Sequence, residues 1–316
     1  MAGIVIKGVG NAHGNRSISN DDLAKTVNTS DEWIRAKTGI RSRYIADKRK
    51  NIDMALESAM KAIADSKIDA ENIKYIFTAT FSPDDLAPSM SCELAGKLGM
   101  GENVFAMDAN CGCAGFIYCC HVANSMLAMD PDKNAAALIL GSEKVLSYVD
   151  MKDRSTCVLF GDGAGAIIVK YDESSNFKYY GGCTPNRDVL YVDRKNQVVQ
   201  MEGQEVYKFA VGKVPKAIKG VMKLADVSEA DIDYFVCHQA NERIIDGAAR
   251  RLTGDKSKFY KNLYYYGNTS AASIPIALGD MNKEGLFDER KQLVCTGFGA
   301  GLVYGSIFIE VNKNDK

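Results

Sequence analysis

The sequence predicts an α/β protein made of two similar halves packed against each other. Apolar strand-like runs alternate with amphipathic helical runs along all 316 residues, a pattern typical of a parallel or mixed sheet covered by helices on both faces. Short segments of the first half recur in the second. No low-complexity linker separates the halves, so we expect one packed unit rather than two tethered domains.

The alternation is clearest around residues 46–80. Residues 46–67 place apolar side chains every three or four positions from Ile52 to Ile63, which is the spacing of one face of an amphipathic helix. Residues 73–80 then form an apolar run that predicts a buried strand. Similar strand or helix signals recur at 135–143, 164–171, 216–225, 234–239 and 291–298.

Two short repeats indicate a duplication. Residues 70–77 (AENIKYIF) resemble residues 229–236 (EADIDYFV), and residues 161–167 (GDGAGAI) resemble residues 297–303 (GFGAGLV). Each copy leads into or contains an apolar strand signal. We therefore expect an N-terminal half at residues 1–172 and a C-terminal half at residues 173–316.

Composition and charge exclude several classes of protein. The formal net charge is -1, so no overall field attracts nucleic acid or a membrane surface. The N-terminus lacks the apolar core of a signal peptide, and we expect no apolar stretch near the roughly 18 residues that span a bilayer. These features predict a cytoplasmic protein with neither a nucleic-acid nor a membrane partner.

The nine cysteines do not predict a metal site. They form no CxxC pair, and the chain has only three histidines, whereas zinc sites use such pairs or clustered histidines. Most of the cysteines lie in apolar runs, where a reduced cysteine behaves as a small buried hydrophobic residue.

Cys113 is the first candidate for chemistry. It lies between a strand-like run at 104–107 and a helical run that begins at Phe116. The helix dipole and unpaired N–H groups at such a junction favour a thiolate. A pKa lowered by about 2 units from near 8.5 would make the thiolate the main form at pH 7. A buried structural cysteine is an equally good interpretation of this segment alone.

His238 is the only credible catalytic histidine. It follows an apolar strand signal, and sites in α/β sheets are built at strand ends, although a single histidine is more often structural. His121 lies eight residues beyond Cys113 on the same predicted helix, about 12 Å away at 1.5 Å per residue. His13 lies in a predicted loop.

Two further segments are candidates for the site. Asn268 or Thr269 is a predicted helix N-cap, and a simple cap is as good an interpretation as a catalytic amide. Residues 297–301 (GFGAG) predict a turn whose backbone N–H groups can hold a developing oxyanion.

Together these segments resemble the ketoacyl-acyl-carrier-protein synthase III family. The matching motifs are collinear: TSDEWIRAKTGIRSRYIA at 29–46, GCAGF at 112–116, DRSTCVLFGDGAGA at 153–166, HQANERI at 238–244, YGNTSAASIP at 266–275 and GFGAG at 297–301. The resemblance implies a thiolase-like fold, with a mixed five-stranded sheet in each half and α-β-α-β-α layering. It also implies a homodimer that condenses a short acyl-CoA primer with malonyl-acyl carrier protein, with loss of carbon dioxide, to start fatty acid elongation.

The resemblance assigns catalysis to three side chains. Cys113 rather than Cys111 precedes the Ala-Gly-Phe motif and would be the nucleophile, with His238 and Asn268 as its partners. The backbone N–H groups of Cys113 and Ala300 would form the oxyanion hole. Because loss of carbon dioxide makes the carbanion, the reaction needs no strong base, and no metal or other cofactor is expected.

The resemblance also implies a coenzyme A site. Trp33, the only tryptophan, would stack on the adenine from an exposed short helix that begins with a Thr29–Glu32 capping box. Arg154 would cover the other face of the adenine. Lys37 stands where the family has an arginine, which keeps the charge but loses the planar fork. The expected set is Trp33, Lys37, Arg154, Gly203, Ala240 and Asn241.

Two surfaces complete the expectation. Residues 206–223 carry five lysines and no acid; this is either a solvated helix face or part of a surface for an acidic carrier protein. The acyl-pocket gate would include Phe298 and Ala87. Ala87 stands where well-known relatives have a large aromatic that caps the acyl pocket of the partner subunit, so we expect a roomier pocket and tolerance of primers longer than acetyl. The expected carrier-protein contacts are Lys208, Gln239, Ala240, Asn241, Glu242, Arg243, Arg250 and Arg251.

Three alternatives stay open from the sequence. A polyketide-type or secondary-metabolite acyltransferase would use the same three side chains. A cysteine protease would present cysteine, histidine and asparagine in this order, although no aromatic residue follows Cys113 directly. A non-catalytic carrier-binding protein on the same fold is the third alternative.

Overall fold

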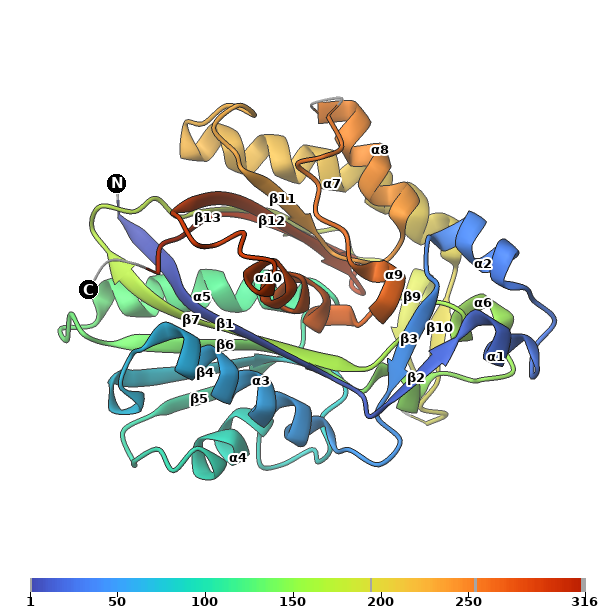
Figure 1. The fold of residues 1–316 in the computed structure, drawn as a ribbon, viewed down its shortest axis with the longest axis horizontal. Coiled ribbons are helices and arrows are strands. Elements are labelled where there is room, and N and C mark those ends of the chain that lie inside the picture. Colours follow the sequence, from blue (N-terminus) through green and yellow to red (C-terminus); the bar gives the residue numbers. More distant parts are fainter. Residues whose placement is uncertain (1, 194, 253–254, 314–316) are drawn as a thin grey trace.

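The computed structural model describes residues 2–193, 195–252 and 255–313, and these form layers of helix and sheet in the order α-β-α-β-α (Figure 1). α3 (Asn51–Ser66) and α4 (Met90–Lys97) cover one outer face, and α7 (Gly203–Ala225) covers the other with α8 (Glu242–Leu252) beside it. α5 (Gly115–Met129) and α10 (Ser273–Lys283) lie between the two sheet layers and contact strands of both.

The strands of the N-terminal part run in the order β1-β7-β6-β4-β5. β4 is parallel to both β5 and β6, whereas β7 is antiparallel to β6 and β1. Every residue of β6 is buried, as expected for a strand covered on both faces. The bounds are β1 (Gly3–His13), β4 (Ile73–Ala79), β5 (Phe105–Ala109), β6 (Ala136–Glu143) and β7 (Gly163–Asp172).

Among the described residues, the main sheet layer of the C-terminal part has four strands, one fewer than expected. β11 is parallel to β12, and β13 pairs antiparallel with β12 and β8. A single bridge between Phe235 and Phe259 stands where a fifth strand would continue the sheet beyond β11. β13 meets β1 at only two registered pairs, so the two sheet layers join along a short seam. The bounds are β8 (Lys178–Cys183), β11 (Tyr234–Cys237), β12 (Lys291–Gly299) and β13 (Val303–Val311).

Residues 112–129, which include α5, are long and apolar enough to cross a membrane by length and composition alone. Our expectation that no stretch reaches this length was therefore wrong. α5 contacts β4 and β6 on one side and β12 and β13 on the other. Its apolar character is explained by this place in the core between the sheets.

Small elements gather at one end of the molecule. β2 (Arg16–Ser19) pairs with β3 (Ser42–Ile45), and β9 (Leu190–Val192) pairs with β10 (Val199–Met201). They lie near three short helices: α1 (Asn20–Ala24), α2 (Asp31–Thr38) and α6 (Arg154–Cys157) (Figure 1). α2 begins after Ser30, whose side chain accepts a hydrogen bond from the backbone N–H of Trp33. The N-cap residue is therefore Ser30 and not Thr29, so the expected Thr29–Glu32 capping box began one residue too early.

The carboxyl ends of parallel strands bring two predicted residues, Cys113 and His238, to one region together with Glu143, which was not predicted. Cys113 follows β5, Glu143 ends β6, and His238 follows β11. Phe298 and Gly299 are the last residues of β12, so the predicted Gly-rich turn is strand up to Gly299 and turns only before β13. Ligands in open α/β sheets bind outside the carboxyl ends of the strands.

Candidate active site

One pocket of about 1270 Å³ contains the three predicted catalytic residues, Cys113, His238 and Asn268, in its lining. Ala300 and Phe298, expected in the oxyanion hole and the acyl gate, also line it. Of the predicted coenzyme A residues, the pocket is lined by Trp33, Lys37, Arg154, Gly203, Ala240 and Asn241. The structure thus gathers residues from both halves of the sequence around one cavity.

Glycines let two backbone segments approach each other at Cys113. A Cβ on Gly299 would lie 2.6 Å from the Cys113 backbone nitrogen, and a Cβ on Gly112 would lie 2.9 Å from the Ala300 nitrogen. Gly112 also has φ of +52°, which glycine adopts without steric cost. The two predicted oxyanion-hole segments therefore lie directly against each other, beside the sulfur.

Burial raises the pKa of the Cys113 thiol to about 12, and the nearby Glu143 carboxyl acts in the same direction. We expected a thiolate stabilised by the helix N-terminus. α5 begins at Gly115, so Cys113 lies near that terminus as predicted, but desolvation outweighs it. A thiol with this raised pKa is protonated at neutral pH, so a nucleophilic role for Cys113 would require a proton acceptor.

His238 is buried and neutral. Burial lowers the pKa of its imidazole to about 3, and its Nδ1 lies 2.7 Å from the Ser273 hydroxyl at the start of α10. A hydroxyl can donate to Nδ1 or accept from it, so both neutral tautomers can be held. One tautomer leaves Nε2 free to accept a proton, and the other presents an N–H donor. The Phe298 ring packs against the imidazole edge-on, with centroids 5.1 Å apart.

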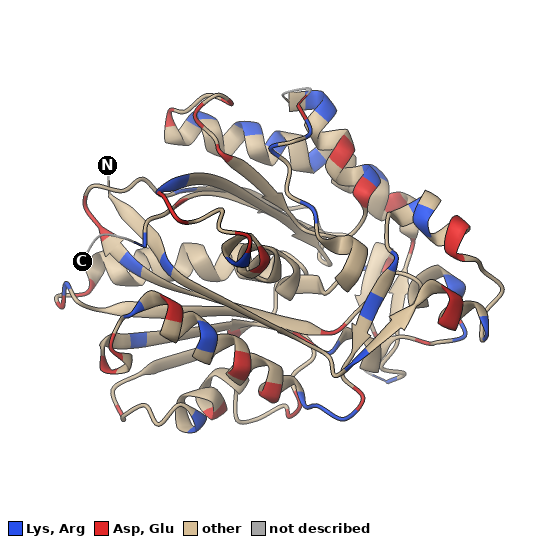
Figure 2. Ribbon diagram, in the orientation of Figure 1, with Lys and Arg blue, Asp and Glu red and all other residues tan. Residues whose placement is uncertain are grey.

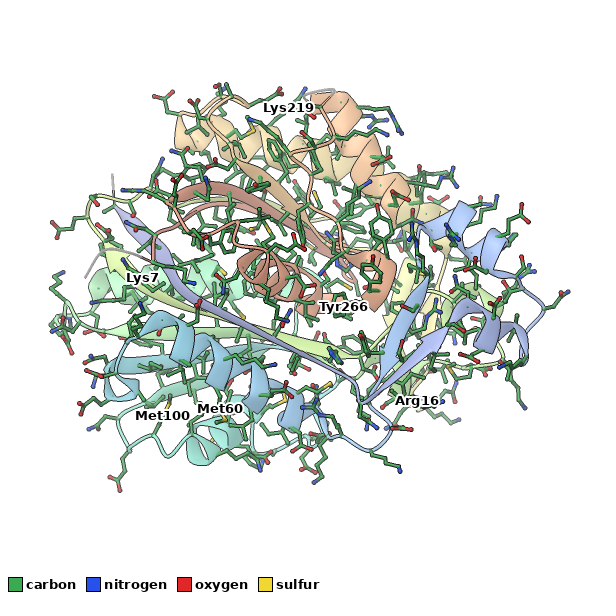
Figure 3. The ribbon with its side chains drawn as sticks, viewed as in Figure 1. Lys7, Arg16, Met60, Met100, Lys219 and Tyr266 are labelled. Atoms are coloured by element: carbon green, nitrogen blue, oxygen red, sulfur yellow. The ribbon has the colours of Figure 1, made fainter. Side chains whose placement is uncertain are left out.

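Asn268 is oriented by its own backbone surroundings. It follows α9 (Leu263–Tyr266), whose last residue, Tyr266, is labelled in Figure 3. The Asn268 Oδ1 accepts a hydrogen bond of 2.9 Å from the Ser270 N–H, so the amide nitrogen is the atom left to donate. Of the two predicted caps, Thr269 is the N-cap residue of the short turn η4 (Ser270–Ala272), and its side chain makes no capping hydrogen bond. α10 begins only at Ser273, so neither Asn268 nor Thr269 caps that helix.

The predicted coenzyme A site is basic and aromatic. Trp33 lies on α2 with 37% of its surface exposed, and the Arg154 guanidinium lies 4.9 Å from the centroid of its ring. An adenine between them would have to separate the two groups. The pocket is also lined by Lys37, Lys208 and Arg243, alongside Asp193.

The predicted carrier-protein surface is corrected at Gln239. This residue is 1% exposed; its amide donates to the carbonyls of Cys237 and Tyr260, and its oxygen accepts from the N–H of Asn262. It holds the chain beneath the surface and cannot contact a partner. The sequence around Gln239 is polar and suggested an exposed position. It contained no signal for the buried backbone groups to which Gln239 is hydrogen-bonded.

The remaining members of that surface are accessible to different extents. The Glu242 carboxylate accepts hydrogen bonds from the Lys261 ammonium group and from the Tyr264 hydroxyl of its own chain. Arg243 and Arg250 are exposed, and Arg251 donates to the Val211 carbonyl, which ties α8 to α7. Lys and Arg residues recur along α7 and α8 at the top of Figure 2.

Sequence reasoning missed three residues around the predicted catalytic side chains. Ser273 holds the His238 imidazole, and Ser270 orients Asn268. Glu143 is fully buried beside them and accepts from the Ser270 hydroxyl at 3.0 Å. The signal for Glu143 was present in the sequence, because an acid ends an otherwise apolar run at 135–143.

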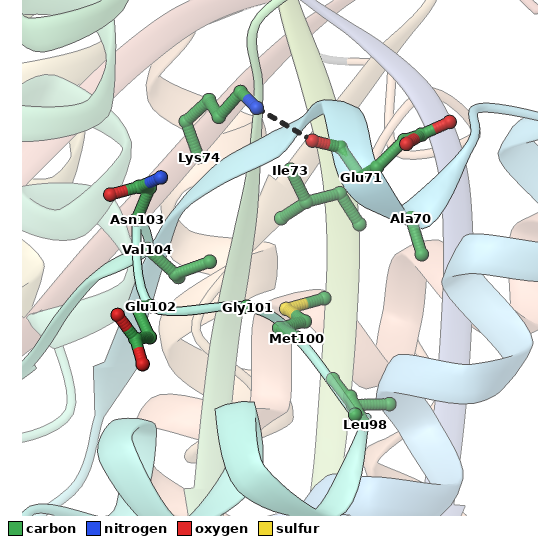
Figure 4. Close-up of a pocket in the computed structure, with 11 residues that line it drawn as sticks. Ala70, Glu71, Ile73, Lys74, Leu98, Met100, Gly101, Glu102, Asn103 and Val104 are labelled. Carbon is green, nitrogen blue, oxygen red and sulfur yellow. Dashed lines mark hydrogen bonds between the residues drawn. The ribbon is translucent and has the colours of Figure 1, made fainter.

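A second, smaller pocket of about 260 Å³ lies away from these residues (Figure 4). It is lined by residues of the turn before β4, of the start of β4 and of the loop between α4 and β5, among them Glu71, Lys74 and Asn103. No residue that we predicted for the site belongs to its lining.

Comparisons with known proteins identify the family of this chain. The protein-family model for 3-oxoacyl-[acyl-carrier-protein] synthase III matches residues 107–181. The family model for the C-terminal part of the same enzymes matches residues 222–311. A beta-ketoacyl-[acyl-carrier-protein] synthase III of Clostridium botulinum is 40% identical, with 98% of this chain and 99% of the relative covered.

Solved structures extend the comparison. The chain is similar to a 3-oxoacyl-[acyl-carrier-protein] synthase III of Aquifex aeolicus, with a TM-score of 0.92, 36% identity, and coverage of 97% and 99% of the two chains. It is also similar to the priming beta-ketosynthase of the R1128 polyketide pathway, with a TM-score of 0.92, 28% identity, and coverage of 98% and 96%.

Fold and pocket together define an acyl-transferring condensing enzyme of the thiolase-like class. The extent of the match to the curated relatives then fixes the family. The chain belongs to the 3-oxoacyl-[acyl-carrier-protein] synthase III family. This membership excludes the cysteine-protease alternative.

Proposed function

We propose that this protein joins a short acyl group from an acyl-CoA to the two-carbon unit of malonyl-acyl carrier protein. Cys113 carries the acyl group, and His238 and Asn268 direct the condensation. The observation that carries the proposal is the single pocket in which these three side chains meet beside the paired backbone segments at Gly299 and Gly112.

In the first half-reaction the Cys113 sulfur attacks the thioester carbon of the acyl-CoA. Because the thiol is neutral at rest, its proton passes to Nε2 of His238, which the low pKa of the imidazole keeps unprotonated. The N–H groups of Cys113 and Ala300 hold the oxyanion of the tetrahedral intermediate. The carbon–sulfur bond to coenzyme A then breaks, and the proton leaves with the coenzyme A thiol.

In the second half-reaction malonyl-carrier protein occupies the pocket. The Asn268 amide and the N–H tautomer of His238 donate to the thioester oxygen and stabilise the enolate formed as carbon dioxide leaves. The enolate carbon attacks the acyl carbon and a carbon–carbon bond forms. The bond from the acyl carbon to Cys113 breaks, and the sulfur leaves as a thiolate that takes a proton from solvent. The protein needs no metal or prosthetic group for these steps.

Intact-protein mass spectrometry separates the two half-reactions. Incubation with a panel of acyl-CoAs is expected to add one acyl group at Cys113, and malonyl-carrier protein is expected to remove it as product. His238→Ala and Asn268→Ala should slow the second step by about 100-fold or more, the size typical of losing an oxyanion donor, and spare acylation more. An equal loss in both steps would contradict the assignment.

A polyketide-priming role is the second candidate function, favoured by the similarity to the R1128 enzyme. Both roles use the same first half-reaction, so the choice rests on which malonyl donor and which primer are accepted. Side-by-side rates with carrier proteins of fatty acid and polyketide synthesis distinguish them.

We also propose a homodimer formed through β5. Within the described residues β5 ends the sheet, and Phe105 on it is 45% exposed; an unpaired edge strand is a template for another chain. Ala87 lies in an exposed loop that precedes α4, and α4 packs against β5. Ala87 does not line the pocket of its own chain, so a role in gating acyl length would act on the partner's pocket. Ala87→Phe should then shorten the accepted primers, and Phe105→Asp should yield monomers in sedimentation.

A further inference from the structure

Ser270 connects three groups of the active site. Its backbone N–H donates to Asn268 Oδ1 at 2.9 Å, and its hydroxyl lies 3.0 Å from Glu143 Oε1. Ser270 and Cys113 line the same pocket, and the Ser270 side chain lowers the pKa of the Cys113 thiol against the effect of burial. A hydroxyl has one hydrogen, so Ser270 can donate to Glu143 or to the sulfur, but not to both.

Glu143 has two carboxyl oxygens with different surroundings. Oε2 accepts from the Thr80 hydroxyl at 3.2 Å, from the Phe81 N–H at 3.2 Å and, by a short bond, from the Ser82 hydroxyl. Oε1 faces Ser270. A proton on this carboxyl therefore belongs on Oε1, because three donors already point at Oε2.

Both protonation states of Glu143 are accessible near neutral pH. The carboxyl is fully buried, and burial raises its pKa to about 7, against the opposing effect of its four hydrogen-bond donors. The titratable groups that interact with it are the Cys113 thiol and the Tyr148 hydroxyl of η2 (Val145–Tyr148). Asp84 acts on Tyr148 from the loop beyond Ser82.

We propose that Glu143 is a positioning residue whose protonation sets the direction of the Ser270 hydroxyl. When Glu143 is ionised, Ser270 donates to the carboxylate and offers only a lone pair to Cys113, which favours the thiol. When Glu143 is protonated, it donates to Ser270, and the Ser270 hydrogen turns to the sulfur, which favours the thiolate. The proposal rests on the proposed function of Cys113 as nucleophile, but it concerns the state of the sulfur and not the substrate.

The substitution Glu143→Gln imitates the protonated carboxyl at every pH, so the Ser270 hydrogen should stay turned toward the Cys113 sulfur. The amide oxygen takes the place of Oε2, where the Phe81 N–H requires an acceptor, and the amide nitrogen takes the place of Oε1. That nitrogen donates to Ser270, as the protonated acid does. Ser270→Gly removes the hydroxyl and suits the backbone, because Ser270 has φ of +52°, a conformation that glycine adopts freely.

Alkylation of Cys113 by iodoacetamide tests the proposal without any acyl substrate. Rates are measured from pH 5.5 to 9 for wild type, Glu143→Gln, Ser270→Gly and the double variant, with the modified residue identified by mass spectrometry. Glu143→Gln is expected to react about tenfold faster at pH 8, the gain from one charge-assisted hydrogen bond to the sulfur. The gain should disappear at pH 5.5, where the wild-type carboxyl is also protonated.

The double variant distinguishes the hydroxyl from a simple charge effect. On the Ser270→Gly background, Glu143→Gln should change the rate less than threefold, because no hydroxyl remains to be turned. A tenfold gain on both backgrounds would show that the carboxylate acts on the sulfur only by its charge, and would overturn the proposal. If Glu143→Gln does not fold, Ser270→Gly alone decides: it should remove the inflection near pH 7 from the wild-type profile, and an unchanged inflection would refute the proposal. Failure of the condensation assay would leave this test intact.

Discussion

Gly299→Ala is expected to disable the nucleophile without unfolding the protein. The added Cβ would lie 2.6 Å from the Cys113 nitrogen and 3.1 Å from the Cys113 Cβ. Ordinary contacts begin at 3.4 Å, so the Cys113 backbone or the end of β12 must move by about 0.8 Å, the difference between 3.4 and 2.6 Å. This displacement falls on the N–H group that we assign to the oxyanion hole.

The expected loss is about 100-fold or more in the rate of acyl transfer to Cys113, since removing one oxyanion donor costs 10²–10³ in rate. The assay is rapid mixing with an acyl-CoA followed by intact-protein mass spectrometry. Gly212→Ala is the matched control: no atom lies within 4 Å of its added Cβ, and alanine in the interior of a helix adds about 0.5–1 kcal/mol of stability.

Thermal unfolding of both variants shows whether the fold survives. An acyl-transfer rate for Gly299→Ala within threefold of wild type, in a folded protein, would refute the assignment of the Cys113 N–H group. It would also show that the backbone at the end of β12 can shift to make room for the added methyl group, although this segment is buried and paired with β13.

Two other predictions follow from the pocket. Trp33→Ala should raise the KM for acyl-CoA roughly tenfold, the loss of one base-stacking contact, and should leave transfer from a short thioester without adenine unchanged; an equal effect on both donors would contradict the stacking role. Burial lowers the pKa of His238 below its unfolded value, so the folded protein should lose stability as the pH falls below 6.5, by roughly 1.4 kcal/mol per pH unit until the folded pKa near 3. Urea unfolding of wild type and His238→Gln between pH 6.5 and 5 checks this, and equal slopes for both proteins would count against it.

The three candidate catalytic residues could be selected from the sequence because each lies where an apolar run gives way to small or polar residues; their catalytic roles stay a prediction. Cys113, His238 and Asn268 all have this setting, and the structure brings them to one pocket. Alternation and repeats also predicted the layered fold, because buried strands and amphipathic helices have different periods. The division of the chain at residues 172 and 173 stays a prediction.

What the sequence did not reveal depends on contacts between distant segments. The neutral state of Cys113 is set by burial, and no local pattern measures burial at a helix terminus. Gln239 was predicted at the surface, but its partners include Tyr260 and Asn262, more than twenty residues away. Glu143 was interpreted only as the end of a strand, because its donors come from residues 80–82 and from Ser270.

The middle layer of the molecule has a consequence for how activity is lost. The proposed nucleophile stands before α5, and the residues that orient its two proposed partners stand just before and at the start of α10. Separating these two helices would remove both partners from the sulfur at once, even if each portion of the chain kept its strands. If the proposed roles hold, catalytic rate is a sensitive indicator of whether the two portions of the chain are docked.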